Sequence, residues 1–552
     1  MTRGRVLYAA LIVLILSAAL PAAAPIDISD AAIERLLAHP FQFDYTTLTS
    51  DSALRRLVDA VDLQLATIEY RQLKELISSP QDSLIKQEFG RDLEARYRDI
   101  LGDGFLFDKL RPWRQTTSDP ACRAYIGLIT ERREALQADP TLLRGAKELA
   151  QRIADRLYQF RFAVGGKEYQ GADIVGLMES GSDRNLLKAL YRLQNDSAAI
   201  LAADASRLYG LYSRMGEGRG YPTSFDYTLS RLSFRKPEWF KIAEDLTTAT
   251  EAEYQACLTA VRQDVGDNNL SFFDIDHYLR QGAQLPDEYF STAAADSAVS
   301  KIMAGVGLDS LAQKLVIIKV DSARWPALAI RFLPPYDVQM VKSNLGGFAY
   351  YRRLVTEMAR TLPWVYADTA LPFLLRDYPA GTEEMITGAF EGWALDSAFL
   401  AANFSIPQDQ LNRFITCNRR LSVFRLRQQL VYFMMEYYLS EGKSAVPATL
   451  FWSLEKSLLG VTDSSFQWIE TLLTGTMEKY PEWIAHQFTR IKLNEILDKR
   501  FGDGYMGDKR TGPFIINAFC RSGRTRTAEE FVTGYDVDRL SVDDIKRQWR
   551  LR

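Results

Sequence analysis

Histidine is scarce in this sequence. Only three histidines occur among the 552 residues, at His39, His277 and His486, and no two of them lie near each other along the chain. A helix that presents two imidazoles to one zinc ion carries them four residues apart, and no such pair exists here. We therefore interpret each histidine as a lone structural or surface residue.

Cysteine is also rare, and its four residues are scattered singly: Cys122, Cys257, Cys417 and Cys520. Their spacing forms neither a disulfide framework nor a thiolate metal cluster. We expect buried free thiols, although an oxidising compartment would permit one or two bridges among three possible pairings.

Neither sign of charge is in excess. The chain has 67 Lys and Arg against 70 Asp and Glu, so its net charge is −3. No basic field is present to hold nucleic acid, which excludes that class of partner. Because 47% of the residues are hydrophobic, the chain can bury a large core and is expected to be globular.

The N-terminus has the composition of a secretory signal peptide. Arg3 and Arg5 precede an apolar run at 6–20, and the small residues 22–24 follow. The apolar run is short for a membrane span, which favours a cleaved signal peptide. The alternative is an uncleaved anchor, and this segment is the only membrane contact that we expect. We predict a signal peptide at 1–24 and a periplasmic or secreted protein.

Long amphipathic helices are predicted along most of the remaining chain, for example at 54–77 and 142–162. No internal repeat or linker divides it, so 25–552 is expected to be one mainly α-helical domain. Two short segments at 315–320 and 327–332 are rich in β-branched or alternating apolar residues. They are predicted to pair as antiparallel strands.

A helix with a distinctive polar stripe is expected soon after these strands. Apolar positions recur at Tyr351, Leu354, Val355, Met358 and Leu362. The polar stripe beside them consists of Arg353, Thr356, Glu357 and Arg360. The simplest interpretation is an ion pair of Glu357 with Arg353 or Arg360 on a solvated face.

A second amphipathic helix follows at 384–402. Glu384 and Glu391 lie two turns apart on one face of it. The apolar stripe of this helix consists of Met385, Ile386, Ala389, Phe390 and Trp393. Two consecutive helices with acidic residues on their polar faces therefore follow the predicted strands.

Together these segments resemble the helical gluzincin peptidases, the group that includes angiotensin-converting enzyme, thimet oligopeptidase and oligoendopeptidase F. Segments at 218–229, 274–309, 334–355, 480–505 and 527–536 are similar to that family in the same order, so the resemblance covers most of 170–536. It implies an all-α, zincin-like helical clamshell of two lobes around a deep groove, with a small antiparallel sheet near 315–343.

The resemblance also implies roles for single residues. In the family, H-E-x-x-H supplies two zinc ligands and the general base, and a Glu on the following helix supplies the third ligand. Here Thr356 and Arg360 stand at the histidine positions, Glu357 at the base position and Glu384 at the third ligand position. Glu391 is a candidate for supporting this site, and Tyr480 for the family's transition-state tyrosine.

The two replacements argue against zinc. A threonine hydroxyl is a poor zinc ligand, and a guanidinium cannot be deprotonated and repels a dication. We predict that the Arg360 guanidinium lies where the ion would lie, bridging to Glu384 and to Glu357, with no cofactor bound and Glu357 vestigial.

The sequence thus favours a pseudopeptidase that binds a peptide or protein ligand without zinc hydrolysis, but it leaves the question of activity open. The alternative is an active metallopeptidase, of oligopeptidase or dipeptidyl carboxypeptidase type, with an atypical zinc site. Its metal would be held by Glu357, Glu384 and either Glu391 or Glu383. A third interpretation is a structural or assembly protein that uses only the helical body.

Overall fold

The computed structural model describes most of the chain after the N-terminus. The described residues are 45–78, 83–136, 139–171, 174, 177, 183–217, 220–230, 236–321, 326–378, 382–442, 446–463, 465, 467–474, 480–526, 530, 534 and 542–549. The predicted signal segment and His39 lie outside them. No helix in the described ranges is long and apolar enough to cross a membrane.

The first described helices pack around a core of their own. They are α3 (Asp51–Ser78), α4 (Ser83–Gly102), α5 (Gly104–Leu110), α6 (Trp113–Thr116) and α7 (Pro120–Leu136). Leu374 and Leu375, from the short turn η4 (Phe373–Leu375), complete this core. The buried carboxylate of Asp62 on α3 accepts hydrogen bonds from the backbone N–H groups of Phe373 and Leu374. The N-terminal helices are therefore fixed to a segment far along the chain.

A second and larger core is built almost entirely from helices. It includes residues of α8 (Pro140–Gln159), α10 (Arg184–Ile200), α11 (Ala202–Glu217), α12 (Ser224–Ser230), α13 (Lys236–Val265), α14 (Phe272–Gly282), α21 (Pro447–Leu459), α22 (Gln467–Thr474) and α26 (Val542–Trp549). A small antiparallel hairpin of β1 (Arg161–Val164) and β2 (Lys167–Gln170) packs beside α10.

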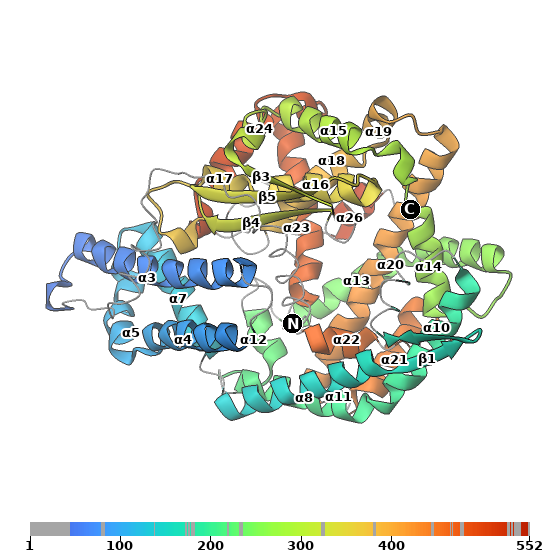
Figure 1. Cartoon of the computed structure of the whole chain (residues 1–552), viewed down its shortest axis with the longest axis horizontal. Helices are drawn as coiled ribbons and strands as arrows, with labels where there is room; N and C mark the ends of the chain where they lie inside the picture. Colours follow the sequence, from blue (N-terminus) through green and yellow to red (C-terminus); the bar gives the residue numbers. More distant parts are fainter. Residues whose placement is uncertain are drawn as a thin grey trace.

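A third core contains the sheet and the two helices of interest. Its elements are α15 (Thr292–Gly305), β4 (Ala327–Leu333), β5 (Asp337–Ser343), α16 (Phe348–Arg360), α17 (Leu362–Tyr366), α18 (Thr382–Ala394), α19 (Ser397–Asn403) and α24 (Thr511–Ile515). The third strand of the sheet, β3 (Val316–Val320), packs in a small separate cluster with Ile330 and Val341. Two long helices, α20 (Gln408–Ser440) and α23 (Tyr480–Phe501), contribute residues to both this core and the larger helical one. Figure 1 shows them running between the sheet region and the end of the molecule formed by α8, α11 and α21.

The sheet confirms the predicted strands but not their direct pairing. Its order is β3-β5-β4, with β5 parallel to β3 and antiparallel to β4. The strand at 337–343 therefore lies between the two strands that were expected to pair. The reason is burial, because Val338, Gln339, Met340 and Val341 are all buried, as in a central strand covered on both faces.

The mainly α-helical fold class with a small sheet is confirmed. The four cysteines are free and buried, as expected. The deep groove between two lobes stays a prediction.

Candidate functional site

The helix with the polar stripe is α16, and its start is set by two glycines. Gly346 and Gly347 have φ of 68° and 99°, values that other residues rarely adopt. A Cβ on Gly347 would lie 2.9 Å from a carboxylate oxygen of Asp287. That carboxylate accepts a hydrogen bond of 2.7 Å from the first N–H of the helix, at Phe348, and so caps it. The helix ends at Arg360, and Pro363 lies in the next short helix, α17.

Glu357 is fully buried and has no free carboxylate oxygen. Its Oε2 accepts a hydrogen bond of 2.9 Å from the backbone N–H of Ala329 on β4. Its Oε1 is paired with Arg353 at 2.8 Å and with Arg360. The predicted pairing with these two arginines is confirmed, but the face is not solvated, because the Glu357 side chain is 0% exposed. The carboxylate therefore joins α16 to the edge of the sheet.

Arg360 connects Glu357 to the next helix. Its Nε donates a hydrogen bond of 2.6 Å to the carboxylate of Glu383 on α18, and its Nη1 donates to Glu357. Burial lowers the pKa of Arg360, but the two carboxylates raise it by more, so the net shift is upward. Burial raises the pKa of Glu383, and Arg360 opposes this shift. The arginine is thus a permanent cation held between two acids.

The acid that meets Arg360 differs from the predicted one. The sequence predicts Glu384 of α18 as the partner of Arg360, but in the structure Arg360 pairs with Glu383, one residue earlier. Adjacent helical residues point about 100° apart, so only one of them can face α16. Glu383 is partly buried, whereas Glu384 is exposed. The bridging role therefore belongs to Glu383.

Two other predicted site residues bond to groups outside the Glu357 cluster. The Thr356 hydroxyl donates to the carbonyl of Arg353, at 2.9 Å, within its own helix. Glu391 forms an ion pair with Arg352. Neither residue meets Glu357 through these contacts.

Two predictions in the C-terminal helix α23 remain open. Tyr480 is the first residue of that helix, but its side chain and that of His486 lie outside the described side chains.

His277, in α14, stacks on the ring of Phe273 at 5.1 Å between centroids. Burial lowers the pKa of His277, as expected for a structural histidine.

These residues do not fit a zinc ion. Within the described ranges, no group of three or more His, Cys, Asp or Glu side chains could hold a metal. At the family's ligand positions the chain has a helix-bonded hydroxyl, a guanidinium and an exposed carboxylate. The alternative set of carboxylates is not assembled either, because Glu357 and Glu391 are each paired with arginine.

A second buried ion cluster lies close by and was missed by the sequence analysis. Asp377 pairs with Arg331 of β4 at 2.9 Å and with Arg524 at 2.7 Å, and accepts a hydrogen bond from the indole of Trp364. Burial raises the pKa of Asp377, but the two arginines lower it by more, so the net shift is downward. These partners lie 46 and 147 residues away, and no local pattern links them.

Solved structures with a similar fold include peptidases. A structure described as a putative peptidase from Chlamydophila abortus matches with a TM-score of 0.68 over 95% of each chain, at 11% sequence identity. A Pyrococcus furiosus carboxypeptidase matches with a TM-score of 0.61 at 12% identity, over 93% of this chain and 99% of that one. An M32 carboxypeptidase from Deinococcus radiodurans matches with a TM-score of 0.56 at 12% identity, over 90% and 97%.

No model of a known protein family matches the sequence, and no curated protein matches it either. At identities this low, the likeness to solved structures establishes the fold alone. The chain therefore has a peptidase fold along nearly its whole length.

Proposed function

We propose that this protein is a secreted or periplasmic relative of the helical gluzincin peptidases that has lost zinc-dependent hydrolysis and instead binds a peptide or a protein partner. The observation that carries the proposal is the Arg360 guanidinium, held between Glu357 and Glu383. The peptidase fold of the solved relatives supports the family assignment.

The physical argument concerns the charge of the site. A buried carboxylate without a cation is strongly destabilising, so loss of a metal requires another positive charge. Arg353 and Arg360 supply it for Glu357. A zinc ion added beside them would be repelled by two fixed cations, and it would find no imidazole among the ligands. Water activation at neutral pH requires such a strongly polarising ion.

Metal and activity measurements on the purified protein test the loss of catalysis. After exposure to zinc and dialysis, elemental analysis is expected to find far less than one zinc per chain. A set of quenched fluorescent peptides is expected to remain uncut. One tightly retained zinc per chain, with cleavage abolished by Glu357→Gln, would instead establish the active metallopeptidase with a carboxylate-based site.

Binding is tested separately by fluorescence polarisation with labelled peptides of about dipeptide to decapeptide length. Saturable binding of extended peptides is expected, and it should survive a chelator because no metal takes part. If no peptide binds, the binding part of the proposal fails, and a structural or assembly role replaces it. N-terminal sequencing of protein from the periplasm or medium checks the export, with a mature start expected near residue 25.

A further inference from the structure

A separate cavity of about 360 Å³ lies in the helical part of the molecule. It is lined by α10, by residues near the start of α14, and by α21, α22 and the segment between them. No residue of α16 or α18 lines it. Its volume is within the range of small-molecule sites. The cavity is therefore distinct from the Glu357–Arg360 region.

One positive charge at the cavity is already neutralised. Lys188 of α10 donates to both carboxylate oxygens of Asp274, at 2.7 and 3.0 Å, and Arg184 pairs with the same carboxylate. The Asp274 side chain is 0% exposed, so this pairing is structural. Lys188 therefore closes part of the wall through its ion pair with Asp274.

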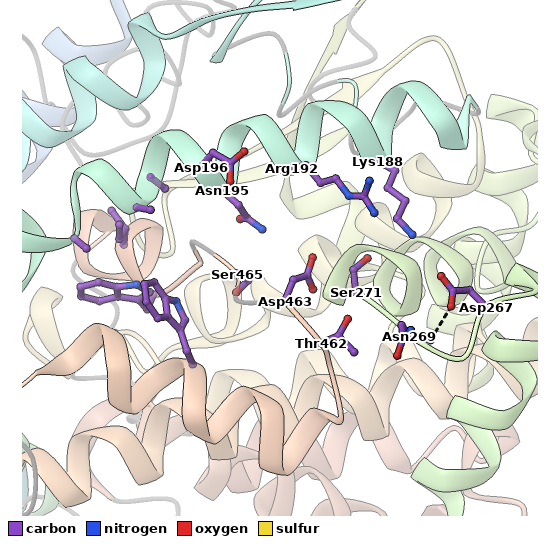
Figure 2. Close-up of a pocket in the computed structure, with 16 residues that line it drawn as sticks. Lys188, Arg192, Asn195, Asp196, Asp267, Asn269, Ser271, Thr462, Asp463 and Ser465 are labelled. Carbon is purple, nitrogen blue, oxygen red and sulfur yellow. Dashed lines mark hydrogen bonds between the residues drawn. The ribbon is translucent and has the colours of Figure 1, made fainter.

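Arg192 and Asp463 are different, because they face one cavity without pairing. Figure 2 shows Arg192 extending from α10 towards the segment at 462–465, and Asp463 pointing back towards α10. Among the described residues, neither forms an ion pair. The Asp463 carboxylate accepts a hydrogen bond of 3.2 Å from the backbone N–H of Phe272, and burial raises its pKa. Opposite charges that lie across a cavity suit a ligand with both charges of its own.

The rest of the wall consists mostly of small and polar residues, together with two tryptophans. Trp468 is 1% exposed and belongs to the large helical core. Trp452 packs against the same core, and its indole Nε1 is buried without a hydrogen-bond partner within the described structure. Trp452 is only partly buried, so its indole offers a ligand a rigid apolar surface, and Trp468 closes the wall behind it.

We infer that this cavity binds a zwitterionic ligand of amino-acid to dipeptide size with an apolar or aromatic side chain. Its carboxylate is held by Arg192, its ammonium by Asp463, and its side chain packs against Trp452. A ligand with only negative charge is disfavoured, because Asp196, Asp267 and Asp463 also line the cavity. A ligand with only a positive charge is also disfavoured, because the Arg192 guanidinium would gain no partner from it. This inference does not depend on the loss of zinc catalysis.

Isothermal titration calorimetry on the full chain tests the inference with four probes. L-Phenylalanine and the dipeptide Leu-Phe carry both charges, phenethylamine carries only the ammonium, and 3-phenylpropionate carries only the carboxylate. At least one zwitterion is expected to bind at least tenfold more tightly than either singly charged analogue, because each charge-assisted hydrogen bond contributes about that factor. Equal affinities, or no binding of either zwitterion by calorimetry and ligand-observed NMR, would overturn it.

Two variants assign the charges. Arg192→Gln is expected to weaken the binding of the zwitterion and of 3-phenylpropionate at least tenfold, and to leave phenethylamine binding unchanged. Asp463→Asn is expected to weaken the binding of the zwitterion and of phenethylamine at least tenfold, and to leave 3-phenylpropionate binding unchanged. Asparagine keeps an acceptor for the Phe272 N–H, so the fold is retained, and thermal unfolding verifies this. Arg207→Gln, an exposed arginine on α11, is the matched control. If the two variants act equally on all probes, or not at all, the assignment is wrong.

Discussion

The Glu357–Arg360–Glu383 cluster and the Arg192–Asp463 cavity handle opposite charges in different ways. In the cluster, the acids and the guanidinium are in direct contact, and Glu357 has no remaining acceptor. In the cavity, Arg192 and Asp463 face each other, and neither forms an ion pair with a residue that the structure describes. The first arrangement stabilises the protein itself, because its charges are already satisfied. The second is suited to an added ligand, because its charges are not.

The largest expected effect comes from breaking the paired cluster. Arg360→Ala leaves the fully buried Glu357 with only Arg353, and should lower the free energy of unfolding by about 3 kcal/mol. Denaturant unfolding followed by circular dichroism measures it. The double variant Arg360→Ala/Glu357→Gln should recover part of the loss, since the fully buried charge of Glu357 is removed. If the double variant loses as much free energy of unfolding as Arg360→Ala or more, the destabilisation does not come from the buried charge of Glu357.

Glu455 is a buried acid that has no ion pair among the described residues, and its charged form should therefore destabilise the protein. Glu455 is 1% exposed and accepts hydrogen bonds from Ser465, and burial raises its pKa to about 7. The unfolded chain loses this proton near pH 4.3, so stability should fall as the pH rises from about 4.5 to about 7, by on the order of 2 kcal/mol. Unfolding of Glu455→Gln across this range should show a smaller fall. An unchanged pH profile would contradict the raised pKa.

The correction from Glu384 to Glu383 predicts a smaller, directional effect. Glu383→Gln removes the charged partner of Arg360 and should cost about 1 kcal/mol. Glu384→Gln changes an exposed carboxylate on the same helical turn, and should cost less than about 0.5 kcal/mol. Thermal unfolding of the pair gives the comparison. Equal losses would mean that the bridge is not specific to Glu383.

The smallest effect is expected on the cavity side of the comparison. Arg192→Gln removes an exposed arginine that pairs with no described residue, so the free energy of unfolding should change by less than about 0.5 kcal/mol. The same denaturant measurement applies. A large loss of stability would show that Arg192 has a structural partner, and would remove the basis for its role in ligand binding.

Local patterns predicted much of the fold and part of the site. The helical periodicity of α16 and α18 and the arginine pairs of Glu357 follow from positions three to four residues apart. The order β3-β5-β4 did not follow, because it depends on which strand is covered on both faces. The choice of Glu383 over Glu384 depends on the rotation of α18 relative to α16.

The sequence by itself determined which groups are present: the helical periodicity, a threonine and an arginine on either side of Glu357, and only three histidines. Only the tertiary structure decided which charges meet. It buried Glu357 against β4, turned Glu383 towards Arg360, and left Arg192 and Asp463 facing one cavity. The reason is that helical periodicity is local, whereas the partners of a charge come from elements that pack together across the chain.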